Sequence, residues 1–455
     1  MSIAPADATA TVMPVGPDAL PSSTDAIPYP RPALAYWTMA VLLLLNIGSC
    51  LDRQILALMV DAVKADLGIS DFQVSLLQGM TFALFYATFG LPLGWAADRF
   101  SRSRLIFAGV TVWSIAASAC GLAQNFWQLM VARIGVGVGE ASLSPAAFSL
   151  LSDTFPRHRL AFAISVFSTG AVIGSALALA IGGLLVGLLP AEGITAPLLG
   201  HLRNWQVVYI VTGLPCLAIG WLIFTVADPV RRGRVSSTTV PVRETLRFVR
   251  RKWRFFVPHF GGFGLMSLCG YGVLIWTPSY IHRVFGWEMI VIGPICALVM
   301  LTGVFGGTAL GVIADRWFAK GRTDAHLRLY MIVAIVQPVL IVAAIAVDNP
   351  YGFFILYGCY HVISSFTGVS SAALQIVTPN EYRGQVSAAF LMTFNLLGLG
   401  VGPSVVAALT SFVFRDPAMV GWAIAATYAI VMPIAALCFA SGLAPMRRAV
   451  AEAVD

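Results

Sequence analysis

Twelve long apolar stretches constrain this chain more than any other feature of its sequence. A helix needs about 20 mostly apolar residues to cross the hydrocarbon core of a membrane. Gly, Pro and charged residues separate the stretches, which occupy residues 33–62, 72–97, 104–124, 127–151, 160–189, 206–226, 257–282, 289–314, 328–347, 351–377, 384–413 and 419–443. We therefore predict an all-α membrane protein with twelve transmembrane helices.

The composition excludes other classes of protein. The chain is 58% hydrophobic and 11% charged, whereas an ordinary soluble chain is about 25% charged. A soluble enzyme and a disordered protein are thereby excluded, and the apolar stretches are too long for the strands of a membrane β-barrel. The sequence contains no nucleophile–base pair near the membrane surface and no Cys or His spacing typical of a metal site. We expect no enzyme activity, no cofactor and no metal.

The positive charges predict the orientation. Counted over the loops and tails, 22 of the 28 Lys and Arg residues fall on the side that holds both termini, and four fall on the other side. Cytoplasmic loops carry such an excess, so we expect both termini in the cytoplasm. The charge then faces anionic lipid headgroups rather than nucleic acid. The sequence has no Asn-x-Ser/Thr sequon, which fits a bacterial inner membrane, and we expect a monomer.

A polar, basic break near residue 240 divides the chain into two halves. We predict a disordered tail over 1–32, six-helix bundles over 33–228 and 257–444, a cytoplasmic linker over 229–256, and a C-terminal tail over 445–455. In the linker, Val242, Leu246, Val249 and Trp253 recur with a helical period, and arginines recur beside them. Such a basic amphipathic helix lies on a membrane surface.

One motif occurs at the ends of the second and eighth stretches. Gly90–Arg99 and Gly307–Arg316 both read Gly-x3-Gly-x3-Asp-Arg, and the offset is 217 at every aligned position. Internal repeats build transporter folds, with the substrate site at the repeat interface. Glycines spaced by four let two helices approach closely. The motif aspartates sit at unfavourable C-terminal helix ends, so we expect Asp98 to cap the eleventh helix and Asp315 the fifth when the cytoplasmic side is closed.

The residues assigned to this cytoplasmic gate are Gly94, Asp98, Arg99, Arg102, Gly311, Asp315 and Arg316. The alternative interpretation is a positively charged anchor at the membrane surface that takes no part in gating.

The repeated motif in a chain of six plus six helices resembles the major facilitator superfamily. Further motifs resemble its spinster group in a bacterial form: Leu51-Asp52-Arg53-Gln54, Leu67–Gly79, Arg133-Ile-Gly-Val-Gly-Val-Gly-Glu140 and Asn395–Pro403. The resemblance implies two pseudo-symmetric bundles. From the animal members it also implies proton-linked movement of lysophospholipids or sphingosine phosphate. Gly170–Gly183 lacks the Gly-Pro step of drug/proton antiporters in the superfamily, so the direction of transport stays open.

Four charged residues lie deep in the apolar stretches. Asp52, Arg53, Arg133 and Glu140 each cost about 2.5–3.5 kcal/mol at the centre of a bilayer, so we expect them to pair or to face a wet cavity. Arg133 should lie near the level of Asp52, with Glu140 deeper. We predict that Asp52 and Glu140 couple protons. We also predict that Arg133 and, less strongly, Arg53 hold the anionic group of the substrate, because a guanidinium matches phosphate or carboxylate. The alternative is a permanent ion-pair network.

The other candidate substrate contacts are aromatic or hydroxyl residues assigned by position alone. They are Phe82, Tyr86, Tyr271, Trp276, Thr277 and Tyr280, and each of them can equally be a helix-packing residue. A charged wall opposite an apolar wall suits an amphiphile, so the leading hypothesis is proton-coupled, alternating-access transport of an anionic lysolipid. Symport of a small organic anion and a non-transporting membrane sensor are the alternatives.

Overall fold

The computed structural model describes residues 29–190, 192–197, 199–226, 228–229 and 241–454. The elements labelled η are short 3-10 or π-helical turns. The first half of the chain contains α1 (Pro32–Gln54), η1 (Ile55–Leu58), α2 (Val60–Leu67), α3 (Asp71–Ser75), η2 (Leu76–Met80), α4 (Thr81–Arg99), α5 (Arg102–Cys120), α6 (Phe126–Glu140), α7 (Leu143–Thr154), α8 (Arg157–Leu188), β1 (Ile194–Ala196), β2 (Gly200–Leu202), α9 (Asn204–Gly220) and η3 (Trp221–Thr225).

In the second half of the chain, all the regular elements within the described residues are helices. It contains α10 (Val242–Arg251), α11 (Trp253–Phe285), α12 (Met289–Ala319), α13 (Ala325–Ala346), α14 (Pro350–Ser364), α15 (Thr367–Val377), α16 (Asn380–Asn395), η4 (Leu396–Val401), α17 (Gly402–Ala408), η5 (Leu409–Phe414), η6 (Pro417–Met419) and α18 (Val420–Val454).

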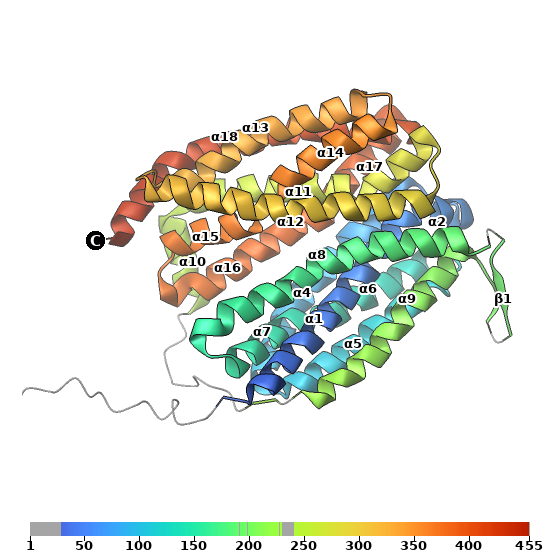
Figure 1. Ribbon diagram of the computed structural model, residues 1–455, viewed down its shortest axis with the longest axis horizontal. Coiled ribbons are helices and arrows are strands. Elements are labelled where there is room, and N and C mark those ends of the chain that lie inside the picture. The colour runs from blue at the N-terminus through green and yellow to red at the C-terminus, as the bar shows by residue number, and fades with distance from the viewer. Residues whose placement is uncertain (1–28, 191, 198, 227, 230–240, 455) are drawn as a thin grey trace, which may run out of the picture.

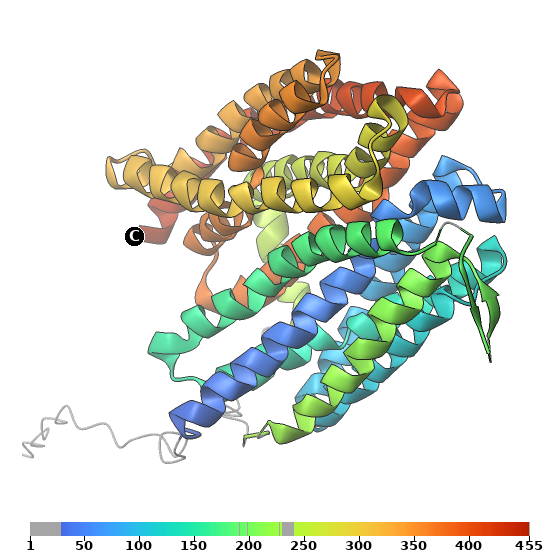
Figure 2. The same ribbon diagram turned by 45° about the vertical axis from the view of Figure 1, so that its right-hand side comes forward.

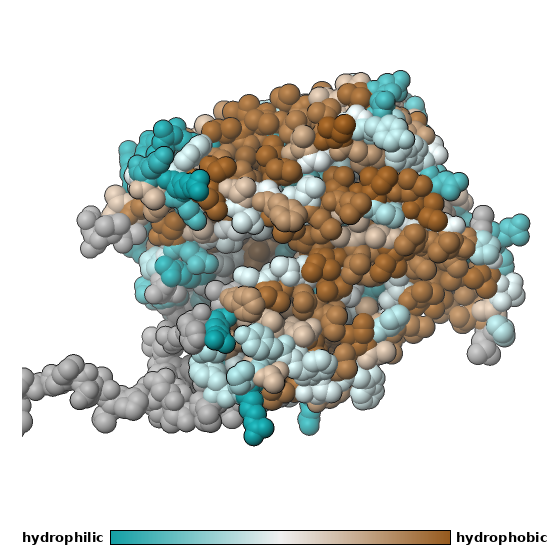
Figure 3. Space-filling view, viewed as in Figure 1, coloured by the Kyte–Doolittle hydropathy of each residue, from teal (hydrophilic) through white to brown (hydrophobic). Residues whose placement is uncertain are grey.

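The prediction of twelve membrane helices is confirmed. Among the described residues, twelve helical segments are long and apolar enough to cross a membrane, and they form two bundles that lie side by side (Figure 1). In the first bundle α1 packs along α8, and α5 packs between α6 and α9; in the second, α11 and α13 pack along α18. Hydrophobic residues dominate the flank of the molecule, and hydrophilic residues gather toward its two ends (Figure 3).

The two ends of the molecule need names. We call the end with residues 100–101, 155–156, 320–324 and 378–379 the basic end, and the opposite end the hairpin end. The hairpin end carries the antiparallel strands β1 and β2, in which Ile194 pairs with Leu202. In Figure 1 the basic end lies on the left and the hairpin end on the right.

Helix boundaries depart from the apolar stretches mainly at the basic end. The predicted C-terminal tail over 445–455 is helical in its described residues, because α18 continues through Pro445 to Val454. Contacts outside the apolar region stabilise this extension: Arg447 donates to Asp324 at 2.6 Å, and Lys252 lies 3.2 Å from Glu452. The predicted N-terminal tail falls mostly on residues 1–28, which lie outside the described residues.

The predicted linker helix is present as α10. It ends at Arg251; the backbone departs from helical geometry at Lys252, and α11 begins at Trp253. Val242 and Leu246 are exposed, as expected of a helix that lies on a membrane surface. Phe248 is buried, and its ring stacks on that of Tyr382 in α16. The sequence pattern did not predict this docking, because Phe248 lies outside the apolar face that recurs along the helix.

The two bundles meet closely at the hairpin end. A Cβ on Gly183 of α8 would lie 2.5 Å from the carbonyl oxygen of Met289 in α12. A Cβ on Gly79 of η2 would overlap the carbonyl oxygen of Leu399 in η4. Glycines without side chains therefore let the two bundles come into backbone contact here.

The same two bundles stand apart at the basic end. The space that a Cβ would fill on Gly90, Gly311 or Gly384 has no neighbouring atom within 4 Å, and the bundles diverge toward this end (Figure 2). Leu91 of α4 and Leu391 of α16 are 72% and 46% exposed. The molecule is therefore closed at the hairpin end and open at the basic end.

Candidate functional site

The four deep charges lie next to interruptions of their helices. The helix α1 ends at Gln54, directly after Asp52 and Arg53, and continues as the 3-10 turn η1. The helix α6 ends at Glu140, and α7 starts at Leu143 with Pro145 in its first turn. Proline has no backbone N–H and is tolerated in a first turn, so this sequence favours a new helix start after Glu140. Interrupted helices expose backbone carbonyls at membrane depth, which is tolerated where protein groups satisfy them.

Arg53 and Glu140 form an ion pair between α1 and α6. The Arg53 guanidinium donates twice to Oε2 of Glu140, from Nη2 and from Nε at 3.2 Å. The Ser49 hydroxyl donates to the same oxygen at 2.6 Å. The Glu140 side chain is fully enclosed, whereas that of Arg53 is 16% exposed. Arg53 is therefore the part of this pair that a solute can reach.

Aromatic rings of α4 line the other side of Arg53. Its guanidinium carbon lies 4.4 Å from the ring centroid of Phe82 and 5.5 Å from that of Tyr86. The Tyr86 hydroxyl lies 3.4 Å from that of Ser144. A guanidinium over an aromatic face is stabilised by the ring quadrupole. The rings hold Arg53 in place while leaving part of its edge open.

Arg133 is fully buried and binds the main chain. Its guanidinium donates to the carbonyl oxygens of Leu77, Asp52 and Arg53, at 3.2, 3.3 and 3.3 Å. Leu77 lies in the π-helical turn η2, and the carbonyls of Asp52 and Arg53 precede the 3-10 turn η1. Arg133 therefore joins α6 to carbonyl groups at the distorted parts of two other helices.

Asp52 lies at the level of Arg133, as predicted, but makes no ion pair within the described residues. Its carboxyl group is buried and accepts no hydrogen bond from a nitrogen or oxygen of those residues; the Cys216 thiol of α9 lies beside it. Adjacent residues point about 100° apart on a helix. Asp52 therefore faces α9 inside the first bundle, while Arg53 faces α4. Of the four deep charges, Arg53 and Glu140 form an ion pair, and within the described residues Asp52 and Arg133 form none.

The candidate residues of α11 are mostly packed within the second bundle. Trp276 donates from Nε1 to the carbonyl oxygen of Pro403 at 3.0 Å, and the Thr277 hydroxyl bonds to Val273 at 2.6 Å. Tyr280 is buried against Phe353. Tyr271 is only partly buried, and its ring centroid is 6.2 Å from that of Phe394. The alternative of helix packing fits the first three, and Tyr271 remains a candidate contact.

Comparison with known proteins identifies the family. A sequence model of the Major Facilitator Superfamily matches residues 42–403. The chain belongs to the Major Facilitator Superfamily. It is 26% identical to a Mycolicibacterium smegmatis protein described as an MFS-type efflux pump, over 92% of this chain and 95% of that protein. It is 25% identical to the Drosophila melanogaster protein spinster, over 84% and 62%, and 25% identical to the Bacillus subtilis hexuronate transporter, over 82% and 86%.

A solved structure of this superfamily has the same fold. The crystal structure of a bacterial homologue of the human lysosomal transporter spinster, inward-facing and unoccupied, matches with a TM-score of 0.76 and 21% sequence identity. The match covers 93% of this chain and 98% of that one. The predicted resemblance to the superfamily, with spinster proteins among the relatives, is confirmed. The chain is a multi-pass membrane transporter of this superfamily.

The repeated superfamily motif lies at the open basic end. Gly94 of α4 and Gly311 of α12 make no close backbone contact in this state: a Cβ on Gly94 would meet Pro145 at 3.9 Å. The expected close approach of helices at these glycines is therefore not formed here, because the bundles stand apart. Asp315 and Arg316 are exposed. The side chain of Asp98 lies outside the described residues, and Arg99 extends over the Trp95 ring.

Arg102 differs from the other assigned gate residues. It is 1% exposed, and it pairs with Asp153 at the end of α7 and with Asp228 beyond η3, the latter at 2.7 Å. Its own backbone N–H donates to Asp228 at 3.0 Å. These contacts join three segments of one bundle at the basic end, so Arg102 stiffens the first bundle.

Arg283 was missed by the sequence analysis. This residue near the end of α11 donates to Asp61 of α2 at 2.6 and 2.9 Å and to Asp71 of α3 at 2.9 and 3.0 Å. Lys64 also lies 2.5 Å from Asp71. Two sequence features could have predicted these contacts. A single basic residue follows the seventh apolar stretch, and acidic residues stand at positions 61 and 71. Together these residues form a lock between the bundles at the hairpin end.

Proposed function

We propose that the protein is a proton-coupled, alternating-access transporter of an anionic amphiphile such as a lysophospholipid. In this proposal the basic end faces the cytoplasm of a bacterium, both termini are cytoplasmic, and the chain works as a monomer. The gate residues of the repeated motif, including Asp98 and Asp315, close the basic end in the opposite state. The structure described here is then the state open to the cytoplasm.

One observation carries the proposal: Arg53 is an accessible cation at mid-membrane between two unlike walls. The first bundle offers the guanidinium with Phe82 and Tyr86. The second bundle offers Tyr271 with Phe394 beside it. An anionic headgroup fits a guanidinium, which donates in a fork, and an apolar chain fits the opposite wall. Arg133 would act indirectly, by fixing the backbone around Arg53.

Proton coupling would use Asp52 and Glu140. An anion that binds Arg53 competes with Glu140 for the same guanidinium. A carboxylate that loses its cation in an enclosed site either gains a proton or remains as an unpaired buried charge, which costs free energy. Within the described residues the Asp52 carboxyl group accepts no hydrogen bond from a nitrogen or oxygen, so its neutral form is the one that suits this enclosure. Exchange of the Arg53 partner thus links substrate binding to protonation.

Symport of a small organic anion is the second candidate. The hexuronate transporter of Bacillus subtilis and the cis,cis-muconate transport protein of Acinetobacter baylyi are similar to this chain. Both names denote small carboxylates, which Arg53 can equally bind. The same site therefore serves either substrate class, and the apolar wall favours the amphiphile.

Flux into proteoliposomes distinguishes the candidates. The purified chain is reconstituted and offered lysophosphatidylglycerol or glucuronate, with and without an inward proton gradient. We expect gradient-dependent movement of the lysolipid that falls at least about tenfold in Arg53→Gln, equivalent to about 1.4 kcal/mol of binding. Movement of glucuronate alone supports the second candidate. Flux of neither substrate, or flux that ignores both the gradient and Glu140→Gln, contradicts the proposal.

A further inference from the structure

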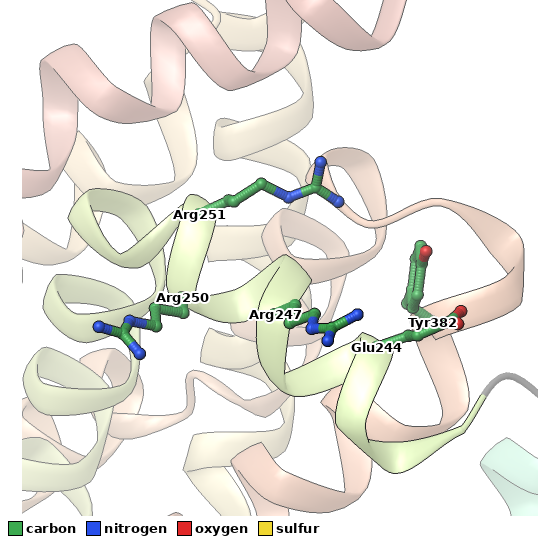
Figure 4. A pocket seen from close by; sticks show the side chains of 5 residues that line it. All are labelled: Glu244, Arg247, Arg250, Arg251 and Tyr382. Atoms are coloured by element: carbon green, nitrogen blue, oxygen red, sulfur yellow. The ribbon is translucent and has the colours of Figure 1, made fainter.

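A basic hollow lies at the basic end between α10 and the first turn of α16. Its volume is about 680 Å³, and it is lined by Glu244, Arg247, Arg250, Arg251 and Tyr382. The side chains of Arg247 and Arg251 extend toward Tyr382, whereas that of Arg250 turns to the opposite side of α10 (Figure 4). Two guanidinium groups and a phenol hydroxyl thus border the same space.

The hollow is held in shape by packing. The rings of Phe248 and Tyr382 stack with centroids 4.7 Å apart and an angle of 2° between their planes. Phe248 also packs edge-on against Phe256 of α11, and Lys252 pairs with Glu452 of α18. The linker helix is therefore docked on three helices of the second bundle, so its arginines have fixed neighbours.

Among the described residues, the positive charge around the hollow exceeds the negative charge. Among the described residues, Arg247, Arg250 and Arg251 have no carboxylate within 4.0 Å in an ion pair, and Glu244 is the single acidic residue of the lining. Like charges held this close repel one another. A guanidinium donates in a planar fork that matches phosphate, so a phosphate group is the counter-ion that this arrangement fits.

The depth of the hollow points to a lipid as the source of the phosphate. The membrane segment of α11 starts at Trp253 and that of α16 at Glu381, so the hollow lies where both helices enter the apolar region. Val242 and Leu246 of α10 are exposed beside it, as is Trp253, and tryptophan is enriched at the headgroup level. Basic pockets at this level bind anionic headgroups.

We propose that this hollow binds the phosphate group of an anionic phospholipid. Arg247 and Arg251 are its cationic ligands, and the Tyr382 hydroxyl donates a further hydrogen bond. The lipid then joins the linker helix to the first turn of α16. This site is separate from Arg53 and does not depend on which substrate the protein transports.

Native mass spectrometry of the full chain in neutral detergent tests the proposal. The protein is mixed with dioleoylphosphatidylglycerol or with dioleoylphosphatidylcholine at equal concentration. We expect retained phosphatidylglycerol to exceed phosphatidylcholine by at least about tenfold. The double variant Arg247→Gln/Arg251→Gln should lose this preference. The control Arg243→Gln/Arg254→Gln removes the same charge from residues outside the hollow and should keep it.

Three outcomes overturn the proposal. Equal retention of the two lipids shows no phosphatidylglycerol site, and an equal loss in the control shows a general effect of surface charge. Inorganic phosphate that displaces phosphatidylglycerol at equal concentration shows a site for a soluble anion instead. Tyr382→Phe guards against misfolding, because it keeps the ring stack with Phe248 and removes the hydroxyl; we expect it to melt as the wild type and to retain less phosphatidylglycerol.

Discussion

At the scale of residues, two arginines in one apolar environment have different surroundings. Arg53 is paired with a carboxylate and keeps some exposed surface. Arg133 is enclosed and satisfies three backbone carbonyls. In the proposed mechanism Arg53 exchanges its partner for a solute, whereas Arg133 stabilises the interruption of α1. The same substitution should therefore affect stability at one position and transport at the other.

The variants Arg53→Lys and Arg133→Lys test this difference. A lysine at 53 can still reach the single oxygen of Glu140, so we expect a melting temperature near that of the wild type and a loss of flux of at least about tenfold. A lysine at 133 cannot serve three carbonyls as a fork does. We expect it to lower the unfolding free energy by about 1–3 kcal/mol. Equal melting temperatures for wild type and Arg133→Lys would contradict this assignment.

The two buried acids should also respond differently to neutral isosteres. Asp52→Asn removes no hydrogen bond to a nitrogen or oxygen group of the described residues, so we expect stability within about 1 kcal/mol of the wild type. Glu140→Gln leaves Arg53 without its anion and should lower stability by about 3–5 kcal/mol, as breaking a buried pair does. Both variants should abolish dependence of flux on the proton gradient. Thermal melts and gradient-driven flux measure these effects, and equal destabilisation by both variants would contradict the unpaired state of Asp52.

How far the sequence predicts this site depends on which force places each residue. The levels of Arg133 and Glu140 in the membrane followed from the helical rise. The cost of burying a charge predicted that Glu140 pairs, but not which residue is its partner. The sequence could not show that α1 ends at Gln54, nor that Arg133 therefore binds backbone carbonyls rather than the side-chain carboxylate of Asp52. The signals were present in Asp52-Arg53-Gln54 and in Pro145, but tertiary contacts decide whether such residues bend or interrupt a helix.

At the scale of elements, Asp324 ties the start of α13 to the end of α18. It accepts from Arg328 at 2.9 Å and from Arg447 at 2.6 Å. Burial acts to raise the pKa of Asp324, but the hydrogen bonds and charges of the two arginines outweigh it and hold the pKa below its usual value. The carboxylate form is thus favoured by folding. Its stabilisation is complete above the unfolded pKa of about 4 and is lost as the pH falls through the lower folded pKa.

Asp324→Asn should therefore lower the free energy of unfolding at neutral pH by about 1–3 kcal/mol, and with it the melting temperature. The difference in melting temperature between Asp324→Asn and the wild type should stay constant between about pH 5 and 8 and should disappear below about pH 4. Differential scanning fluorimetry in detergent over this range provides the measurement. Asp348→Asn, at an exposed position with no ion pair among the described residues, is the control. A gap that persists at the lowest pH would refute the role of the Asp324 charge.

The elements themselves were predictable because burial in lipid requires apolar helices of fixed length. All twelve were located from hydropathy and turn residues. What the periodicity of α10 did not reveal is the stack of Phe248 on Tyr382, since the two residues lie far apart in the sequence. The breaks between α6 and α7 and between α14 and α15 were likewise not predicted, because their residues remain apolar overall and break the helix without interrupting the hydrophobic stretch.

At the scale of the whole molecule, one arginine lies between the two bundles at their closed end. Arg283 belongs to α11, and its acceptors Asp61 and Asp71 belong to the first bundle. Its side chain is 8% exposed and that of Asp71 is 3% exposed. Removing one partner of such a buried pair costs about 3–5 kcal/mol. Moving a two-state equilibrium from 1:99 to 99:1 takes about 5.5 kcal/mol. The free energy held in the Arg283 lock is therefore large enough to shift most of the population from one state to the other.

Arg283→Gln should therefore increase the fraction of molecules that open at the hairpin end and close at the basic end. Spin labels at 199 and 348 report the hairpin end, and labels at 152 and 320 report the basic end, in a background where exposed Cys359 is replaced. We expect pulsed distance measurements to lengthen for the first pair and to shorten for the second. Arg415→Gln removes the same charge from an exposed residue at the same end, whose guanidinium donates to Phe412 of its own segment, and should leave both distributions unchanged. In alternating access the two label distances must change in opposite directions. Longer distances at both ends would indicate loosening of the fold and would contradict exchange between a state closed at the hairpin end and a state closed at the basic end.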